Sequence, residues 1–219
     1  MPFRRWLRKE LQNNNMKFYS KQKNSGFTLI ETMIAVFILT IALTSLLNLN
    51  ASSIFTSRYA KNEIIANYLL QEPIDYIRND RDTTVFQQGS ANTTTAWTNN
   101  FETKYSNCIV NFSSSSGGCY FEPADGPSAV IQSCPVDNIT GFGNLTCPRL
   151  NYDDSASHND FYTYKTTDNS GKSLPSSNFK RQVLVQANGD EFDVKVTVEW
   201  LNGNLTRSRS LQTTLMKWQ

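Results

Sequence analysis

The distribution of apolar residues divides the sequence into parts with different periodicity. Phe27 to Leu47 is an apolar run of 21 residues in which Glu31 is the only charged residue. As a helix rising about 1.5 Å per residue, this run is about as long as the hydrocarbon core of a bilayer is thick. From residue 51 onward the apolar residues recur near the helical period, which predicts an amphipathic helix continuous with the first. These apolar positions are Ile54, Phe55, Tyr59, Ile64, Ile65, Tyr68 and Leu69.

Pro73 lies near the expected end of the amphipathic helix. A proline has no N–H to donate to the preceding turn, so we expect it to kink or end the helix. Ile74 and Ile77 predict one or two further turns, up to the charged run that ends at Asp82. Residues 83–100 are rich in Thr and Asn and are predicted to form a loop or linker with little helix.

The C-terminal part alternates between apolar and polar residues with period two. Three strands are predicted at residues 179–187, 191–201 and 205–218. Asn188-Gly189 and Asn202-Gly203 separate them, and Asn-Gly between alternating runs is a strong signal for a hairpin. In the middle strand we expect one buried face and one wet face, with the amphipathic helix as the cover. The apolar face comprises Phe192, Val194, Val196, Val198 and Trp200, and the polar face Asp193, Lys195, Thr197 and Glu199.

The segment between residues 106 and 178 gives weaker signals. Short strand candidates, "CIVNF", "CYFE", "AVIQ" and "FYTYK", lie between clusters of Ser, Gly, Asp and Pro. Together with the clearer regions, they predict an α+β protein with a long N-terminal helix packed on a C-terminal antiparallel sheet.

Charge is distributed unevenly along the chain. Residues 1–26 carry seven Lys or Arg against one acid, whereas the remainder carries 14 Lys or Arg against 18 Asp or Glu. A basic flank before an apolar segment predicts an N-terminus in the cytoplasm. The mildly acidic remainder has no stripe of Lys and Arg, which argues against nucleic acid as the main partner.

The four cysteines all follow the apolar run and therefore lie on the predicted outer side of the membrane, where disulfides can persist. They are Cys108, Cys119, Cys134 and Cys147. No pair has C-x-x-C spacing, and the single histidine, His158, lies outside the cluster, so two disulfides are favoured over a metal site. Sequential pairing would close two short loops, although four cysteines allow three connectivities.

"SGFTLIETMIAVFILTIAL" resembles the N-terminal signature of type IV pilins and pseudopilins: a basic leader, Gly26, Phe27, Thr-Leu-Ile, Glu31 and an apolar run. The predicted long helix on an antiparallel sheet also resembles this family. "IIANYLLQEPIDYIRNDRD" and "KVTVEW" with "SRSLQTTLMKW" are most similar to minor pilins or minor pseudopilins. Residues 83–178 resemble nothing we can name.

The resemblance implies roles for the matching residues. A prepilin peptidase would cleave between Gly26 and Phe27, the new amine of Phe27 would be methylated, and Glu31 would neutralise the Phe27 amine of a neighbouring subunit. The implied partners are other pilin subunits, the prepilin peptidase/methyltransferase, an inner-membrane assembly platform and, before assembly, the membrane, with no cofactor. The protein would lie in the cytoplasmic membrane and then in an extracellular or periplasmic filament. The implied parts are 1–26 (leader), 27–50 (membrane and polymerisation helix), 51–82 (amphipathic helix) and 83–219 (extracytoplasmic β domain).

Simpler readings stand beside these roles. Glu31 could compensate the helix dipole in an ordinary signal anchor, or contact the amine of its own chain. The leader is longer than many in this class, and a start at Met16 would give a more typical one. Acids at Asp153, Asp154 and Asp160 suggest calcium, but their spacing fails the EF-hand pattern, so a solvated loop that also holds His158 is favoured.

No nucleophile–base pair is evident, so we expect a structural protein and not an enzyme. The leading hypothesis is a minor pilin of a type IV pilus or a related filament. The alternatives are a pseudopilin of a type II secretion or DNA-uptake system and a membrane-anchored binding protein that never polymerises. An anchored enzyme is the least favoured class.

Overall fold

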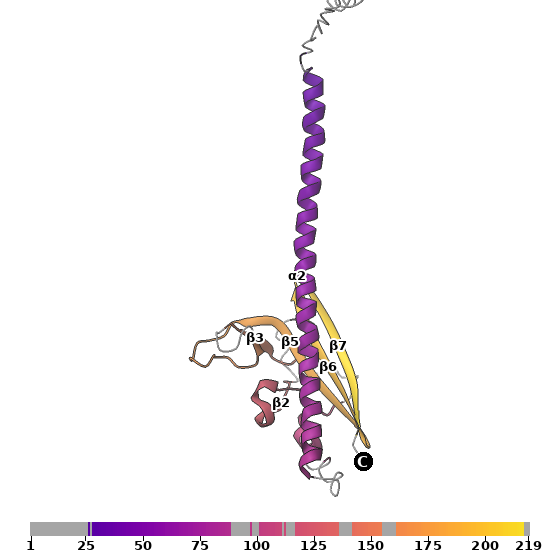
Figure 1. Ribbon diagram of the computed structural model, residues 1–219, viewed down its shortest axis with the longest axis vertical. Coiled ribbons are helices and arrows are strands. Elements are labelled where there is room, and N and C mark those ends of the chain that lie inside the picture. The colour runs from indigo at the N-terminus through magenta and orange to yellow at the C-terminus, as the bar shows by residue number, and fades with distance from the viewer. Residues whose placement is uncertain are drawn as a thin grey trace, which may run out of the picture. The chain divides into compact units, whose positions relative to one another are not determined.

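The structure is a computed structural model, and it describes residues 26, 28–88, 97, 101–110, 112, 117–135, 142–154 and 161–216. The chain divides into two compact units, Met1–Ala51 and Ser52–Gln219, which are described separately. One helix, α2 (Leu29–Gln88), contributes residues to both units. The second unit adds an antiparallel sheet to its share of that helix, which confirms the predicted α+β fold (Figure 1).

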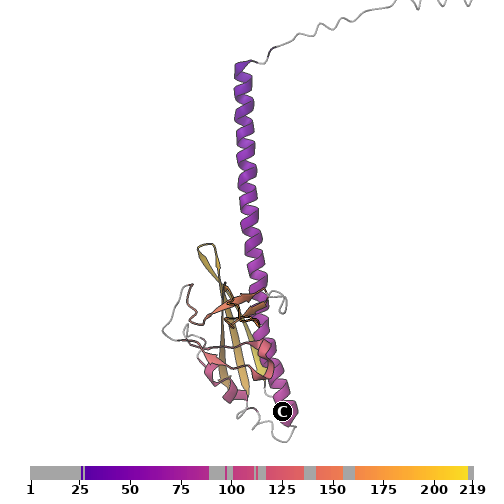
Figure 2. The ribbon, with the colours of Figure 1, turned by 90° about the vertical axis from the view of Figure 1, so that its left-hand side faces the viewer.

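In the second unit α2 lies along one face of the sheet, as Figures 1 and 2 show from two directions. Its buried side chains recur every three or four residues, which places them on one face of the helix. They are Ala66, Leu69, Leu70, Ile74 and Ile77. Full burial of an aliphatic side chain stabilises a fold by about 1.5–3 kcal/mol relative to exposure, so this face anchors the helix. The predicted packing of an amphipathic helix on the sheet is confirmed.

Pro73 does not end the helix. α2 continues through Pro73 to Gln88, so the expected end near Asp82 is wrong, and so is the expected loop as far as Gln88. Residues 89–96 and 98–100 of that loop lie outside the described residues. Proline in a helix interior costs about 3 kcal/mol. Ile74 and Ile77, which are 3% and 1% exposed, bury enough apolar surface to offset that cost.

In the part of the chain that the structure describes, seven strands form one antiparallel sheet. The long meander consists of β5 (Ser176–Asn188), β6 (Glu191–Asn202) and β7 (Leu205–Met216), which confirms the three predicted strands. β5 pairs with β6 along one edge, and along its other edge with β3 (Arg149–Asp153) and β1 (Cys119–Tyr120). β4 (Phe161–Thr163) continues the sheet from β3, and β2 (Gln132–Ser133) continues it from β1.

Glycine at the first loop position closes both hairpins of the meander. Asn188 pairs with Glu191, so the first loop is Gly189-Asp190, and Asn202 pairs with Leu205, so the second is Gly203-Asn204. Gly189 and Gly203 have φ of 65° and 63°. Glycine with positive φ at this position is the pattern of a type II′ turn, whose twist matches that of the strands. The predicted hairpins are confirmed, with each Asn as the last strand residue.

The apolar face of β6 forms the centre of the core. Phe192, Val194, Val196 and Val198 are 0% exposed and Trp200 is 1% exposed, as the alternation predicted. The opposite face is not uniformly wet: Glu199 is buried and accepts hydrogen bonds from the backbone N–H groups of Asn144 and Leu145. Lys180, its partner on β5, is also buried and donates to the carbonyl oxygen of Leu145 at 3.0 Å. The segment around Leu145 therefore covers one end of this face.

Aromatic residues before the first strand complete the core. Trp97, Phe101 and Tyr105 are buried at fourfold spacing, and the ring centroids of Trp97 and Phe101 both lie within 5.3 Å of the Phe192 centroid. The sequence placed Trp97 in a loop or linker and assigned no role to the other two residues. These rings pack in tilted and edge-on geometries that aromatic pairs prefer.

Short elements between residues 106 and 178 differ in part from the expected strands. "CYFE", "AVIQ" and "FYTYK" each contain or overlap one short strand, β1, β2 and β4. "CIVNF" is not a strand, because Cys108 ends the 3-10 helix η3 (Ser106–Cys108) and Ile109 forms only an isolated bridge with Val185. A second 3-10 helix, η4 (Pro123–Ser128), and strand β3 were not expected.

Candidate functional site

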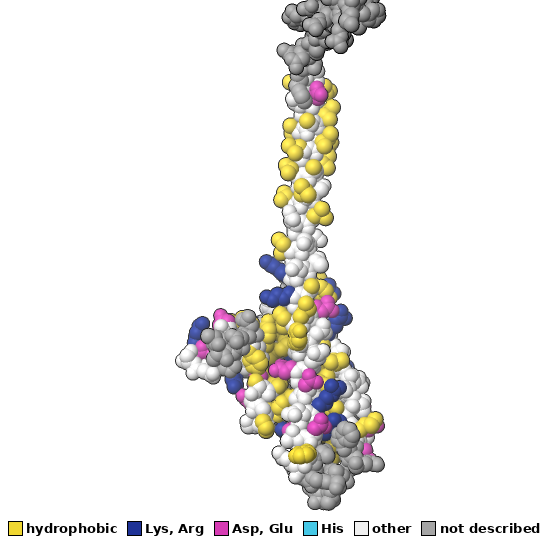
Figure 3. Space-filling view, viewed as in Figure 1, with side chains coloured by type: hydrophobic (Ala, Val, Ile, Leu, Met, Phe, Trp, Pro, Cys, Tyr) yellow, Lys and Arg dark blue, Asp and Glu magenta, His cyan; other side chains and the backbone are white. Residues whose placement is uncertain are grey.

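The unit Met1–Ala51 presents a helix whose described side chains are uncovered. Large apolar side chains from Leu29 to Leu49 are between 51% and 78% exposed within this single chain. Figure 3 shows hydrophobic side chains over the visible surface of this segment. Among the described residues, α2 is the one helix long and apolar enough to cross a membrane.

Hydroxyl groups in this segment are bonded back to the helix. Thr32 donates to the carbonyl oxygen of Leu29 at 2.7 Å, Thr40 to that of Phe37 at 2.8 Å, and Thr44 and Ser45 to that of Ile41 at 2.9 Å. Each hydroxyl proton is therefore satisfied without water, which an apolar environment requires. Among the described residues, the carboxylate of Glu31 has no such local partner.

Glu31 lies in the first turn of α2. Its backbone N–H donates to the carbonyl oxygen of Thr28 at 3.0 Å, which fixes the start of the helix. Within the described residues its carboxylate takes part in no ion pair or hydrogen bond. The positive end of the helix dipole favours a carboxylate here by about 0.3–1 kcal/mol, less than the cost of placing it in a bilayer.

Gly26 is exposed and lies in open space. A Cβ atom built on Gly26 would have no heavy atom within 4 Å, and its φ is not in the left-handed region. The conformation of this chain therefore does not itself require glycine at residue 26. Phe27, the residue expected to carry the new amine, lies outside the described residues, as do residues 1–25.

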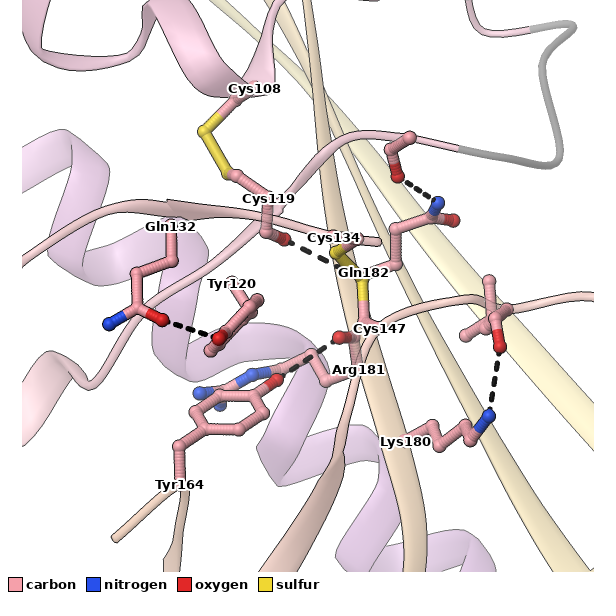
Figure 4. The surroundings of a disulfide bond; sticks show 12 residues. Cys108, Cys119, Tyr120, Gln132, Cys134, Cys147, Tyr164, Lys180, Arg181 and Gln182 are labelled. Atoms are coloured by element: carbon pink, nitrogen blue, oxygen red, sulfur yellow. Dashed lines mark hydrogen bonds between the residues drawn. A yellow bond between two sulfur atoms is a disulfide. The ribbon is translucent and has the colours of Figure 1, made fainter. Parts of the chain in front are cut away.

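The cysteines form two disulfides, Cys108–Cys119 and Cys134–Cys147, with Cα–Cα distances of 4.6 and 4.5 Å. This is the sequential connectivity that the spacing favoured. All four are buried, and the Cys147 sulfur lies 3.9 Å from the carbonyl oxygen of Cys119, so the two crosslinks are neighbours (Figure 4). Gly118 brings the segments together, because its carbonyl oxygen accepts from the N–H of Cys134 at 2.9 Å.

An ion pair that the sequence did not indicate joins α2 to the sheet. Arg181, 1% exposed, contacts Glu72 at 2.5 Å and donates to the carbonyl oxygen of Phe121 at 3.2 Å. Tyr164 donates to the carbonyl oxygen of Arg181 at 3.0 Å, visible in Figure 4, and its ring lies 5.4 Å from the guanidinium carbon. Arg181 stands between Lys180 and Gln182 on β5 and lies 109 positions from Glu72, so only the three-dimensional arrangement reveals its partner.

The acidic loop is only partly described. Asp153 is buried at the end of β3 and Asp154 is exposed, while Asp160 and His158 lie outside the described residues. No group of three or more His, Cys, Asp or Glu in the described part of the chain could hold a metal ion. The expectation of a solvated loop stays a prediction.

Comparison with known proteins identifies the N-terminal segment. Residues 21–47 match the family described as the prokaryotic N-terminal methylation motif. The matched span contains Gly26, Phe27 and Glu31 and covers 27 of the 219 residues. Neither a curated protein nor a solved structure matches this chain.

The motif and the fold together define the class as type IV pilin-like. The segment at residues 21–47 is the type IV pilin leader with the start of its helix, and a long N-terminal helix on an antiparallel sheet is the pilin fold. The resemblance to type IV pilins and pseudopilins inferred from the sequence is thereby confirmed, and the likeness to minor pilins stays a prediction. The motif implies processing by a prepilin peptidase and assembly with other pilins, and the leader with the apolar helix indicates membrane anchoring.

Proposed function

We propose that this protein is a filament subunit, a minor pilin of a type IV pilus or a related filament. The observation that carries the proposal is the Glu31 carboxylate. It lies in the first turn of an uncovered apolar helix, without a partner among the described residues, inside the matched methylation motif. An intramembrane carboxylate costs about 2–4 kcal/mol and calls for a partner that the chain gains on assembly.

The partner of Glu31 in this proposal is the methylated amine of Phe27 on a neighbouring subunit. Cleavage after Gly26 creates that positive charge, so the pair exists only after processing. Both charges are satisfied only when two subunits dock in one axial register. Buried ion pairs are better attested as devices that fix register than as sources of stability.

The apolar side chains of the same segment supply the packing. Ile30, Ile34, Ile38 and Ile41 are each more than half exposed in the single chain. Lipid covers them before assembly and neighbouring helices cover them in the filament. These side chains are therefore not exposed to water in either state, which accounts for the length of the uncharged run.

Gly26 serves the peptidase in this proposal. Because a side chain at residue 26 would meet none of the described residues, this proposal assigns the requirement for glycine to an external partner. Glycine permits a close approach of the backbone to a protease active site.

Mass spectrometry of the full chain purified from cells that contain the peptidase tests the processing step. We expect an N-terminus at methylated Phe27, and full retention of residues 1–26 in a Gly26→Val variant. A mature N-terminus at another residue, or normal cleavage of Gly26→Val, contradicts this step.

Glu31→Ala tests the assembly step. We expect this variant to be cleaved normally and to remain in the membrane, but to be absent from sheared filaments. Thr32→Ala is the matched control, because it removes a polar side chain from the next residue and should still assemble. Normal incorporation of Glu31→Ala contradicts the role given to Glu31, whereas absence of the wild-type protein itself from sheared filaments favours an anchored binding protein that does not polymerise. A pseudopilin uses the same chemistry, so the experiment tests the filament class as a whole.

A further inference from the structure

The unit Ser52–Gln219 contains a pocket of about 760 Å³ between α2 and the ends of β5 and β6. This volume is in the range of about 300–1,000 Å³ that small-molecule sites occupy. The helix contributes Arg58, Lys61 and Ile65, and the sheet contributes Tyr162, Phe179 and Asn202. None of its described lining residues belongs to residues 26–51, which carry the proposed assembly chemistry.

Among the described residues that line the pocket, the charged side chains are those of Arg58 and Lys61, and both are positive. Arg58 and Lys61 stand three positions apart on α2, so their side chains share one face of the helix. Both are exposed, neither forms an ion pair within the described part of the chain, and no Asp or Glu is among the lining residues. Arg209 with Glu63 and Lys165 with Asp125 show that some exposed cations of this unit do have acidic partners. Two unpaired cations beside a hollow favour a ligand that carries negative charge.

Aromatic rings form one wall of the pocket. The Tyr162 centroid lies 5.3 Å from the Tyr152 centroid and 5.3 Å from the Phe179 centroid, so the three rings form a continuous group. Tyr152 and Tyr162 are half-buried and Phe179 is buried. Half-buried tyrosine offers a flat apolar surface together with a polar hydroxyl.

The remaining polar groups of the pocket are uncharged. Asn62, Ser177 and Asn178 line it, and so does Asn202, a residue that is 5% exposed. Its Nδ2 group is buried and has no hydrogen-bond partner. A buried N–H without an acceptor costs about 1–3 kcal/mol, so a ligand oxygen reached by a small rotation of this side chain would recover free energy.

We propose that this pocket binds an acidic carbohydrate, a sugar ring that bears a carboxylate. Arg58 and Lys61 bind the carboxylate, Tyr152 and Tyr162 contact the apolar face of the ring, and the Asn and Ser side chains bind hydroxyl groups. A nucleic acid strand fits less well, because residues 52–219 carry 14 Lys or Arg against 17 Asp or Glu and so repel a polyanion. A purely apolar ligand would leave the two cations and the Asn202 amide without partners.

This binding function is independent of filament assembly. The pocket residues lie outside the methylation motif, and its ligand contacts do not involve Gly26, Phe27 or Glu31. A chain that fails to polymerise can still bind the sugar, and the reverse also holds.

Isothermal titration of the full chain in detergent micelles tests the proposal. The probe is a trisaccharide of galacturonic acid, and the neutral galactose trisaccharide of equal length is the reference. We expect the acidic probe to bind at least ten-fold more tightly than the neutral one, with affinity that falls as salt rises. No binding of the acidic probe, or equal binding of both sugars, overturns the proposal.

Paired variants locate the site. Arg58→Gln/Lys61→Gln should weaken binding of the acidic probe at least ten-fold. Arg207→Gln/Lys172→Gln, which removes the same charge from exposed residues outside the pocket, should leave it within two-fold. An equal loss in both variants assigns the effect to overall charge and overturns the site. A Glu tripeptide or a thymidine trinucleotide that binds as tightly as the acidic sugar overturns the carbohydrate class.

Discussion

Arg181 of β5 and Glu72 of α2 form an ion pair that links the centre of the sheet to the helix in the second unit. The Arg181 Nη1 and Glu72 Oε2 atoms are 2.5 Å apart, and the Arg181 side chain is 1% exposed against 28% for Glu72. Removal of one partner from a buried pair costs far more than the pair contributes, because the remaining charge stays in a medium of low dielectric. The pair therefore fixes how α2 meets β5.

Glu72→Ala should lower the free energy of unfolding by about 3 kcal/mol, because it leaves the Arg181 guanidinium buried without a counter-charge. Arg181→Met/Glu72→Met should recover most of that loss, since neither charge remains. Urea unfolding of the full chain in detergent, followed by the fluorescence of buried Trp97 and Trp200, measures both values. Arg209→Ala, which removes an exposed pair with Glu63, is the control and should change stability little. A Glu72→Ala loss as small as that of the control contradicts the role given to Arg181.

Alkaline pH should destabilise the second unit between about pH 10 and pH 12. Burial raises the pKa of Tyr164 to about 12, and burial with the nearby Asp80 carboxylate raises the pKa of Tyr105 above its ordinary value of about 10. Because the folded pKa exceeds the unfolded one, the contribution is complete below pH 10 and is lost as pH rises through the folded pKa. For Tyr164 this contribution is about 3 kcal/mol at most.

Stability measured against pH, with the absorbance of ionised tyrosine in the same samples, checks this dependence. Tyr164→Phe should flatten the fall above pH 10, although it also loses the hydrogen bond to the Arg181 carbonyl oxygen. Tyr68→Phe alters a side chain that is 70% exposed and should leave the slope unchanged. An equal slope in the wild type and Tyr164→Phe is the result that excludes this cause.

Gly118→Ala should destabilise the protein much more than Gly171→Ala. The two glycines have φ of 78° and 82°, so both variants suffer the same backbone strain of about 1–2 kcal/mol. A Cβ on Gly118 would lie 2.7 Å from the carbonyl oxygen of Val183, whereas a Cβ on Gly171 meets nothing within 4 Å. We expect a loss of about 3 kcal/mol or more for Gly118→Ala in urea unfolding. Equal losses would show that β5 yields to the added methyl group.

Loss of either disulfide should lower stability by about 2–4 kcal/mol, since each closes a short loop in the unfolded chain. The sequence separations, 11 for Cys108–Cys119 and 13 for Cys134–Cys147, are nearly equal, so paired Cys→Ser variants should be destabilised alike. The loss of unfolding free energy in the variant that lacks both disulfides should differ from the sum of the two single losses, because the crosslinks are in contact. Urea midpoints and slopes of the three variants provide the measurement, and strict additivity contradicts the coupling.

Local patterns were enough to predict the membrane segment, the meander and the packing of α2. The alternation from Phe192 to Trp200 and the glycines after Asn188 and Asn202 act over a few residues, so sequence periodicity records them directly. The expected end of the helix near Pro73 was wrong because helix propensity describes an isolated helix. In this protein the tertiary burial of Ile74 and Ile77 determines where the helix ends.

The features that the sequence did not predict depend on contacts between residues far apart in the chain. Trp97, Phe101 and Tyr105 have a spacing of four that is a helical signal, but the Thr- and Asn-rich residues around Trp97 masked it. The pairing of Arg181 with Glu72 spans 109 residues, and the pocket at Arg58 and Lys61 is completed by residues more than 90 positions away. Such relationships depend on the fold of the whole unit, so no local sequence pattern predicts them.

The short reach of the two disulfides has a consequence for export. The topology predicted from the basic N-terminal flank exports the chain from its N-terminal end. Both bonds are made among residues 108–147, so in that topology all four thiols emerge while residues 148–219 are still to follow. Because each cysteine joins the next one along the chain, oxidation in order of arrival gives the native connectivity. Correct crosslinking then needs an oxidant but no isomerase, and strands β5, β6 and β7 dock onto a segment that is already closed.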